Sequence, residues 1–411
     1  KRVIVADITE YASSLTKRLA QRQLKQQGLM VAAPAGAGVY HFRPLLDAHP
    51  EAPPVTALDP DEVALFQYTG GTTGVAKAAM LTHHNLTVNI AQVGRWLASR
   101  EENNERVVGA IPLFHVYGMT VAMGVAIHSA GKLILVPNPR PIESVMQVIH
   151  KERATLFPGV PAMYIGIINH PDVGQYDLRS VRACISGSAP LPMEVQVKFG
   201  EITGGRLVEG YGLTEAAPVT HCNPIYGIRK AGSIGVPVSD VEAKIMDHER
   251  FSEKPVGEAG ELWLRGPQVM PGYWGQPAET AQTLTGDGWL RTGDIARVDE
   301  DGYFYIMDRL KDVINVSGFK VLPREVEEAL FQQPKVQEAV VIGVPDRVRG
   351  EVVKAYIVLK PGASATVAEI TQWCAGRLAP FKVPRQVEFR AELPKTTVGK
   401  TLRRALVAEE K

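Results

Sequence analysis

The chain has 411 residues, 45% of them hydrophobic and 22% charged, which is enough to build two or three domains with cores of their own. Its net charge is only +1, so it lacks the basic surface that nucleic-acid binding needs. Its three cysteines lie far apart without metal or redox spacing, which indicates a reducing compartment. The most apolar stretch, residues 119–136, is too interrupted by histidine and lysine to cross a membrane.

The first predicted elements lie before residue 60. A strand-like run at residues 3–6 directly follows Lys1 and Arg2, which is typical of the middle of a protein, and no signal peptide is visible. Residues 8–27 predict a helix rich in Lys, Arg and Gln, and a Pro/Gly/Ala linker follows at residues 33–39.

A run of glycines and threonines follows a predicted strand at residues 63–68. Glycines let backbone N–H groups approach an anion closely, and the threonine hydroxyls and one lysine add donors and charge. The run therefore suits the phosphates of a nucleotide, through Thr69, Gly70, Gly71, Thr72, Thr73, Gly74 and Lys77. It is not a Walker A loop, because two residues separate Gly74 from Lys77 and an alanine follows. A plain surface loop is the alternative.

Residues 106–210 alternate short apolar runs with helical patterns, which predicts an α/β architecture with a mostly parallel sheet. The predicted strands are residues 107–111, 132–136, 155–157 and 181–185, and the predicted helices are residues 141–153 and 192–200. Residues 232–305 lack long helices and predict a β-rich subdomain. The last hundred residues predict a small α+β domain. We expect boundaries at 1–228, 229–308 and 309–411.

Glu209 to Glu215 reads Glu-Gly-Tyr-Gly-Leu-Thr-Glu after a predicted strand at residues 206–208. The glycines that flank Tyr211 predict a tight turn that presents its ring to a nucleotide base. Glu215 is placed to hold Mg²⁺, which neutralises phosphate oxygens. Taken alone, such a run is more often an ordinary turn.

Several other runs are less specific. Residues 186–192 form a turn between a strand and a helix, the place where α/β sheets bind ligands, although a plain loop explains the run nearly as well. His115 follows a strand, where a lone histidine is more often structural. Asp294 ends a glycine-rich run that predicts a turn, and a carboxylate accepts both ribose hydroxyls well. The charges at residues 308–312 are alternatively a solvated linker, and Lys400 is alternatively surface decoration.

In their order and spacing these motifs resemble the adenylate-forming superfamily of acyl-CoA synthetases, luciferases and peptide-synthetase adenylation domains. The resemblance covers nearly all of residues 60–411. The runs at residues 68–81, 210–215, 289–294 and 394–404 are similar to bacterial long-chain fatty-acid–CoA ligases. Asn315 departs from the lysine of several relatives, and the family's long N-terminal portion is absent from this sequence. We expect apolar surface to be exposed without that portion.

The resemblance implies roles for single residues. Residues of the adenine loop are Gly187, Ser188, Ala189 and Pro190, and residues of the base and phosphate motif are Glu209, Gly210, Tyr211, Gly212 and Thr214. His115 lines the acyl pocket, Arg309 reaches the ribose or phosphate, and Lys311 is a hinge. Gly318 belongs to a segment used in a second half-reaction, and Lys400 contacts the carboxylate and α-phosphate.

The resemblance also implies a fold and a reaction. The fold is a large α/β domain with a β-rich subdomain and a small α+β C-terminal domain. The reaction joins a long-chain fatty acid to coenzyme A through an acyl-adenylate, with ATP and Mg²⁺. Alternatives are a ligase that stops at the adenylate, one for aryl or medium-chain acids, and an inactive nucleotide-binding fragment. The expected location is cytoplasmic. Peripheral attachment to the inner face of the membrane and a homodimer stay open.

Overall fold

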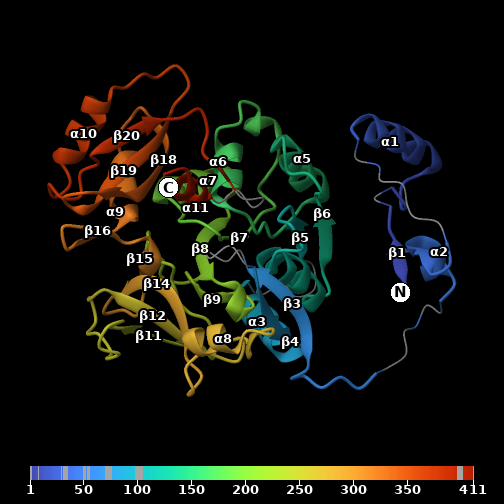
Figure 1. The fold of residues 1–411 in the computed structure, drawn as a ribbon. Coiled ribbons are helices and arrows are strands. Elements are labelled where there is room, and N and C mark those ends of the chain that lie inside the picture. The colour runs from blue at the N-terminus through green and yellow to red at the C-terminus, as the bar shows by residue number, and fades with distance from the viewer. Residues whose placement is uncertain are drawn as a thin grey trace. The chain divides into compact units, whose positions relative to one another are not determined.

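The computed structural model describes residues 2–7, 9–28, 30, 36–49, 52, 56–69, 76–97, 105–395 and 401–410 (Figure 1). The chain forms two compact units, residues 1–58 and residues 59–411. In the first unit, β1 (Val3–Val5) pairs in parallel with β2 (Val39–His41), accompanied by α1 (Ser14–Gln26) and α2 (Phe42–Asp47). The predicted helix at residues 8–27 begins six residues late, because the Ser13 hydroxyl caps it by accepting from the Thr16 N–H.

The second unit is built on a mixed sheet whose centre is parallel. Its strands are β6 (Lys132–Leu135), β5 (Arg106–Gly109), β7 (Ala183–Ser186) and β8 (Arg206–Gly212). Leu156 joins β5 to β7 through single parallel bridges to Val107 and Ala183, so the strand predicted at residues 155–157 shrinks to one residue. Beyond β8 the sheet turns antiparallel, with β9 (Val219–Cys222) and β10 (Val236–Pro237).

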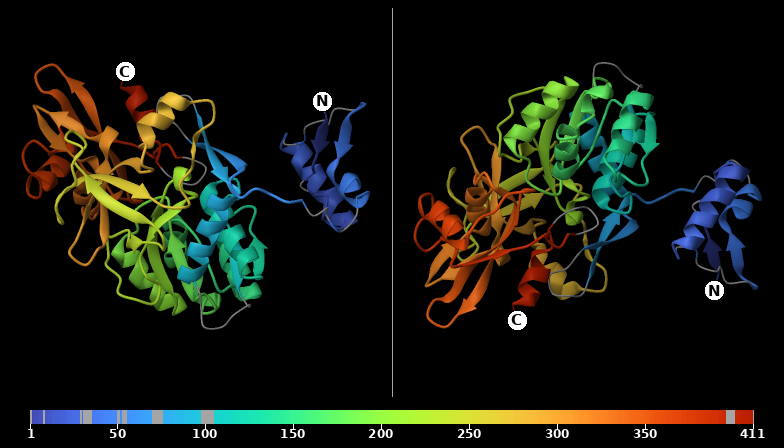
Figure 2. Two further views of the ribbon diagram at one scale, coloured as in Figure 1. Left: turned by 90° about the horizontal axis from the view of Figure 1, so that it is seen from below. Right: turned by 90° about the horizontal axis from the view of Figure 1, so that it is seen from above.

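Helices cover both faces of this sheet, as Figure 2 shows. Neighbouring residues of a strand point to opposite faces. Val108 and Cys184 therefore enter a core with α5 (Glu143–Glu152), α6 (Pro161–Ile168) and α7 (Met193–Thr203). Val107 and Ala183 enter a second core with α3 (His83–Leu97), the π-helix η1 (Gly118–Gly124) and α4 (Val125–His128). A short 3-10 helix, η2 (Val173–Gln175), follows α6. The predicted α/β architecture is confirmed.

The run of glycines and threonines connects the two strands of a hairpin. β3 (Val63–Thr69) pairs antiparallel with β4 (Lys77–Thr82), so that Thr69 stands opposite Lys77. β13 (Gly272–Tyr273) adds a third strand along β4. The sequence motifs predict neither β4 nor β13 as a strand, because both strands are short. Their pairing also joins segments that are almost 200 residues apart in the chain. Gly70, Gly71, Thr72, Thr73 and Gly74 lie outside the described residues.

The β-rich subdomain is an antiparallel sheet of β11 (Glu242–Met246), β12 (Gly260–Arg265), β14 (Leu290–Val298) and β15 (Phe304–Arg309). It contains one short helix among the described residues, α8 (Pro277–Thr283), and the 3-10 helix η3 (Thr214–Ala216) precedes it in the chain, directly after β8. Its core is formed by apolar side chains that include Leu262, Leu264 and Leu290. The prediction of strands without long helices is confirmed here.

The C-terminal part has a five-stranded sheet with helices on both faces. Its strands are β16 (Ile314–Val316), β17 (Phe319–Val321), β18 (Val336–Asp346), β19 (Gly350–Leu359) and β20 (Gln386–Phe389), preceded by the 3-10 helix η4 (Leu310–Asp312). α9 (Pro323–Phe331) and α10 (Val367–Ala375) pack in one core, and α11 (Arg403–Glu409) packs through Leu406 in the other. The predicted α+β unit is confirmed, whereas the three-domain division stays a prediction.

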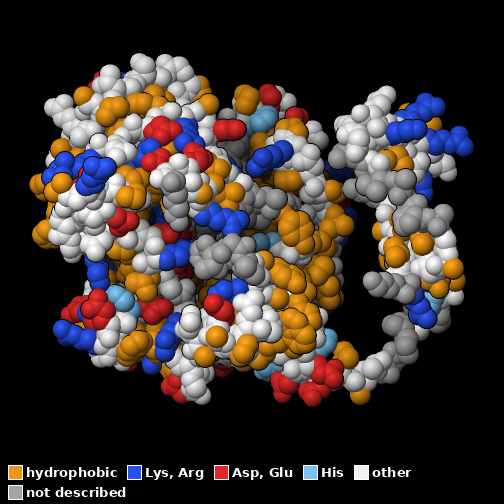
Figure 3. Space-filling model, in the orientation of Figure 1, with side chains coloured by type: hydrophobic (Ala, Val, Ile, Leu, Met, Phe, Trp, Pro, Cys, Tyr) orange, Lys and Arg blue, Asp and Glu red, His pale blue; other side chains and the backbone are white. Residues whose placement is uncertain are grey.

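Hydrophobic side chains are exposed on the second unit near β3 and β6 (Figure 3). They include Phe66, Tyr68, Phe114, Ile127 and Leu135, which are each 43–72% exposed. Several large apolar side chains are therefore exposed on the second unit. No helix among the described residues is long and apolar enough to cross a membrane.

Candidate active site

The candidate site lies where the parallel strands β7 and β8 end. The loop after β7 begins at Gly187, and Ser188 adopts a left-handed conformation with φ of 71°. Tyr117 supports this loop, because its hydroxyl donates to the Ile185 carbonyl at 2.6 Å and to the Gly159 carbonyl at 3.2 Å. A Cβ on Gly187 would stand 3.2 Å from the Tyr117 ring. Ala189 and Pro190 continue the loop toward α7.

Glu209 ties this loop to β8. Its Oε2 accepts a hydrogen bond from the Leu191 N–H at 3.1 Å, and its side chain is almost completely buried. Burial raises the pKa of Glu209 to about 7 from its ordinary value of 4.5. Glu209 therefore has a structural partner inside the protein, and it holds the predicted adenine loop against the neighbouring strand.

Tyr211 lies inside β8, and not in the tight turn that its flanking glycines predict. The glycines allow close packing here. A Cβ on Gly210 would lie 2.7 Å from Cγ2 of Ile185, and one on Gly212 would overlap the Pro218 carbonyl. Tyr211 pairs with His221 of β9 across the strands, with the two rings 6.1 Å apart.

Asp294 likewise lies inside a strand, β14, and not at the end of a turn. Gly293 has φ of 70° and lies in a bulge of β14 opposite β12, which explains the glycine-rich run. The Tyr211 hydroxyl donates to Asp294 Oδ2 at 2.5 Å, and Arg309 Nε lies 3.4 Å from Asp294 Oδ1. Burial and Asp294 raise the pKa of Tyr211, so its hydroxyl stays protonated as the donor. Three predicted site residues from three motifs thus meet at one corner.

Glu215 sits in η3, directly after Thr214, where the chain leaves β8. Its Oε1 accepts a hydrogen bond from the Tyr273 hydroxyl at 2.7 Å, and its carbonyl accepts one from the Met270 N–H at 2.8 Å. No group of three or more metal-ligating side chains occurs among the described residues. A single carboxylate is nevertheless the donor set that fits Mg²⁺ carried by phosphates, because Mg²⁺ is usually held by one or two carboxylates and substrate oxygens.

The ends of the glycine and threonine run are held by side chains from elsewhere. The Thr69 hydroxyl donates to the Lys77 carbonyl at 3.4 Å. The Lys77 ammonium forms an ion pair with Glu279 of α8 and lies 5.2 Å from the centroid of the Tyr273 ring. Neither Glu279 nor Tyr273 belongs to a predicted motif, because only the antiparallel pairing of β13 with β4 brings them here.

His115 lies in the loop after β5. Its Nδ1 accepts a hydrogen bond from the Tyr117 N–H at 3.2 Å, so the neutral ring carries its proton on Nε2. The Gln67 amide of β3 donates to the Phe114 carbonyl at 3.1 Å and holds this loop against the hairpin. These contacts fix the ring in the loop after β5, whereas its place in the wall of an acyl pocket stays a prediction.

The predicted hinge is charged and only partly buried, because Asp308 is buried whereas Lys311 is exposed. Partial desolvation, followed by Arg309, lowers the pKa of Lys311. Asp308 accepts hydrogen bonds from the N–H groups of Arg309 and Arg324, both at 2.7 Å. Arg403 of α11 contacts Asp312 at 2.9 Å, so the last helix is joined to the hinge.

Two loops of the C-terminal part carry predicted site residues, Gly318 and Lys400, and only the first of these residues is described by the structure. Gly318, with φ of 88°, and Ser317, with φ of 52°, form the two-residue turn between β16 and β17. Lys400 lies outside the described residues. The chain on either side of it is joined, because the Leu402 N–H donates to the Pro394 carbonyl at 2.7 Å.

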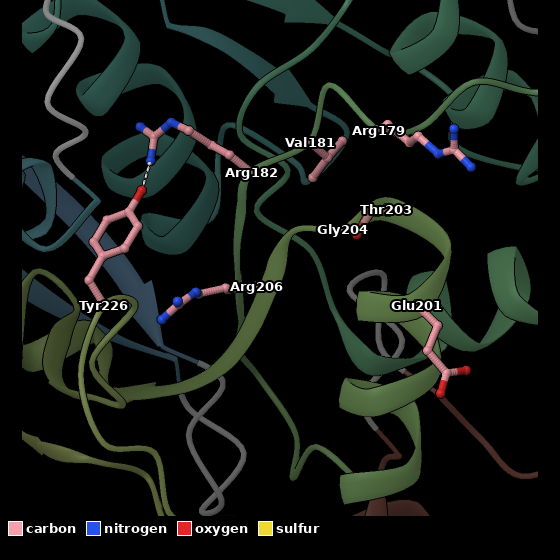
Figure 4. A pocket seen from close by; sticks show the side chains of 8 residues that line it. All are labelled: Arg179, Val181, Arg182, Glu201, Thr203, Gly204, Arg206 and Tyr226. Atoms are coloured by element: carbon pink, nitrogen blue, oxygen red, sulfur yellow. Dashed lines mark hydrogen bonds between the residues drawn. The ribbon is translucent and has the colours of Figure 1, made fainter.

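A surface hollow of about 520 Å³ lies at the opposite end of the parallel strands, where β7 and β8 begin (Figure 4). Arg182 and Arg206 line it, but both have internal partners. Arg182 pairs with Glu105 and donates to the Tyr226 hydroxyl at 2.8 Å, and Arg206 donates to the Ile225 carbonyl at 2.7 Å. Ligands of α/β sheets bind at the carboxyl ends of strands, so this hollow is not part of the candidate site.

The chain is similar to known families and to known proteins. The AMP-binding enzyme family matches residues 2–274, and the AMP-binding enzyme C-terminal domain matches residues 325–400. A long-chain-fatty-acid–CoA ligase of Bacillus subtilis is 51% identical over 357 residues, which are 87% of this chain and 63% of that protein. One of Escherichia coli O6:H1 is 43% identical over 350 residues, 85% of this chain and 62% of that protein.

A crystal structure shares the fold. ATP-bound MatB from Rhodopseudomonas palustris superimposes with a TM-score of 0.85 at 31% identity, covering 100% of this chain and 79% of that one. The chain thus spans somewhat less than two thirds of the length of the two curated relatives.

Proposed function

The chain belongs to the AMP-binding enzyme family, and we propose that it activates a long-chain fatty acid with ATP and transfers the acyl group to coenzyme A. The products are acyl-CoA, AMP and pyrophosphate. The proposal is supported by the two curated relatives, both named long-chain-fatty-acid–CoA ligases, and by the ATP-bound MatB structure with the same fold.

The observation that carries the proposal is the corner of Tyr211, Asp294 and Arg309. Asp294 uses one oxygen for the Tyr211 hydroxyl and the other for Arg309, so a carboxylate, an aromatic ring and a cation converge within hydrogen-bonding range. We assign the Tyr211 ring to the nucleotide base, Asp294 to the ribose hydroxyls and Arg309 to the ribose or a phosphate. Glu209 supports this assignment, because it holds the loop of residues 187–190 beside the same strand.

In the first step, an oxygen of the fatty-acid carboxylate attacks the α-phosphorus of ATP, and the bond to the β-phosphate oxygen breaks. We assign Thr69, Lys77 and the run between them to the phosphates, and Glu215 to Mg²⁺. When bound, Mg²⁺ neutralises charge on the phosphate oxygens. Lys400 supplies positive charge to the two anions that must meet, and His115 lines the pocket of the acyl chain.

In the second step, the thiol sulfur of coenzyme A attacks the acyl carbon. The new C–S bond replaces the C–O bond to AMP, and the thiol proton is released. We propose that the C-terminal part turns about Lys311 between the steps, exchanging Lys400 for the turn that contains Gly318. Hinge motion of this type completes a site only when the substrate for each step is bound.

The reaction is tested by acid-dependent exchange of labelled pyrophosphate into ATP, with saturated acids of different length and an aryl acid as alternatives. The same measurement is made on this chain and on a version extended by the N-terminal portion of the curated relatives. We expect exchange with long-chain acids, followed by thioester formation when coenzyme A is added. Exchange with aryl acids alone, or ATP binding without any exchange, would overturn the proposal.

A pair of variants tests the corner directly. Asp294→Asn removes the charge that faces Arg309, and we expect ATP to bind about 10-fold more weakly, as for a lost charge-assisted hydrogen bond. Asp299→Asn is the matched control, because Asp299 lies in the same subdomain but pairs with Lys230 at 2.6 Å. Equal ATP affinities of the two variants would contradict the assignment of Asp294.

A cytoplasmic location, peripheral membrane attachment and a homodimer are also part of the proposal. Co-sedimentation with vesicles of anionic lipid tests the attachment, and light scattering after gel filtration tests the dimer. A monomer that stays in the supernatant would exclude both.

A further inference from the structure

Tyr273 lies between the hairpin of the phosphate run and Glu215. It is the last residue of β13 and stands opposite Ala79 of β4, two residues beyond Lys77. Its side chain is only 6% exposed, and its hydroxyl donates to Glu215 Oε1 at 2.7 Å. A tyrosine at this place therefore links the first strand after the phosphate run to the carboxylate assigned to Mg²⁺.

Tyr273 is held by contacts of its backbone and of its ring. The Tyr273 backbone N–H donates to the Thr280 hydroxyl at 2.9 Å, which fixes β13 to α8. A Cβ on Gly272 would lie 2.7 Å from Thr280 Cγ2, so this approach requires glycine. The Lys77 ammonium lies over the ring and pairs with Glu279, also in α8. The phenol therefore has little freedom to move away from Glu215.

Glu215 is joined to the same segment a second time through its backbone. The Met270 N–H donates to the Glu215 carbonyl at 2.8 Å. The following residues, Ala216 and Ala217, are fully buried, and Ala217 has a left-handed φ of 62°. Both the main chain and the side chain of Glu215 are thus fixed by residues 270–273.

The chemistry of the two groups sets the direction of the hydrogen bond. A tyrosine hydroxyl can donate, whereas a carboxylate oxygen can only accept, so Tyr273 is the donor and Glu215 the acceptor. The described part of the chain provides a hydrogen bond to Oε1 of Glu215 and none to Oε2. One carboxylate oxygen is therefore committed to Tyr273, while the other remains available to a cation.

We propose that Tyr273 is a positioning residue for the metal of the nucleotide: its hydroxyl orients Glu215 so that one carboxylate oxygen is kept for Mg²⁺. The inference rests on the proposed function, because it takes Glu215 as the ligand of Mg²⁺ carried by ATP. Groups that orient a ligand in this way typically change metal affinity 10- to 100-fold when they are removed.

The test measures the dependence of ATP binding on Mg²⁺, without any fatty acid. The dissociation constant of ATP is determined by calorimetry in EDTA and in excess Mg²⁺. The value in EDTA divided by the value in Mg²⁺ is the factor by which the metal strengthens ATP binding. We expect Tyr273→Phe to lower this ratio about 10-fold and to leave the value in EDTA unchanged. Tyr303→Phe is the matched control, because that buried hydroxyl donates to the Ile228 carbonyl at 2.6 Å in the β-rich subdomain. It should leave the ratio as in the parent chain.

A double-mutant cycle separates positioning from a general loss of structure. In a Glu215→Ala background, Tyr273→Phe should not lower the ratio further, because the group through which it acts is gone. An unchanged ratio in Tyr273→Phe, or an equal further loss in the Glu215→Ala background, would overturn the positioning role. ATP binding that requires Mg²⁺, in a chain that shows no acid-dependent exchange, would refute the proposed reaction and leave the role of Tyr273 intact. A parent chain that binds no ATP would overturn both.

Discussion

The buried carboxyl of Glu209 should make the stability of the large unit depend on pH. Its pKa is about 7 in the folded chain against an ordinary value of 4.5, so between these values the folded state binds the proton that the unfolded state releases. The group therefore stabilises the fold fully below pH 4.5, and the stabilisation is lost as pH rises through 7. The difference between the two pKa values corresponds to about 3 kcal/mol, at 1.36 kcal/mol for each unit.

Glu209→Gln tests this reasoning, because its side-chain amide stays neutral at every pH while its oxygen can still accept from the Leu191 N–H. At pH 5 the free energies of unfolding of the variant and the parent chain should be similar. At pH 8 the variant should be more stable by about 3 kcal/mol, since the parent must bury a charge. Urea unfolding followed by tryptophan fluorescence at several pH values measures the difference.

The matched control is Glu194→Gln on α7, a carboxylate whose side chain is 75% exposed and pairs with Lys198. It should leave the pH dependence of unfolding nearly unchanged. If the difference between Glu209→Gln and the parent were the same at pH 5 and pH 8, Glu209 would not titrate in this range, and the argument from its burial would be refuted.

Three further predictions follow from the site. Glu215→Ala should abolish pyrophosphate exchange and weaken Mg²⁺-dependent ATP binding with an unchanged circular dichroism spectrum; parent-like exchange would remove Glu215 from the site. Lys400→Ala should slow adenylation about 10²–10³-fold but still form thioester from preformed acyl-adenylate, whereas Lys311→Pro should do the reverse, because proline resists the turn at the hinge. Both lysine variants are measured in the N-terminally extended chain, and equal loss of both half-reactions would refute the rotation. Gly159→Val should lower stability by about 1–3 kcal/mol in urea unfolding, because its Cβ would lie 2.7 Å from the buried Tyr164 hydroxyl; an unchanged midpoint would show that this core can adjust.

The predictions that succeeded rest on local patterns. The alternation of apolar runs and helical segments predicted the strands β5, β6 and β7 and the helices α5 and α7, because hydrophobic periodicity depends on nearby residues. The three motifs that carry Tyr211, Asp294 and Arg309 were also visible in the sequence. Their meeting was suggested only by resemblance to a family, since no local pattern encodes a contact across 83 residues.

The errors have a common physical origin. Glycine next to a functional residue predicted a turn at Tyr211 and at Asp294, but the structure uses these glycines for close packing and for a bulge inside strands. Tyr273 and Glu279 were missed because each belongs to a short element whose partner strand or lysine is far away in the sequence. Tertiary pairing, and not local preference, decides the position of such residues.

The two cores on either side of the parallel sheet bear on how this protein can change during evolution. Val107 and Val108 are neighbours in the chain, yet they pack in separate cores. Substitutions that alter volume on one face can be compensated by partners on that face, without involving the other. Insertion of one residue within β5 would instead exchange the two sets of side chains. We therefore expect substitutions on the two faces to accumulate independently of each other. Insertions and deletions should be confined to the loops that join the strands.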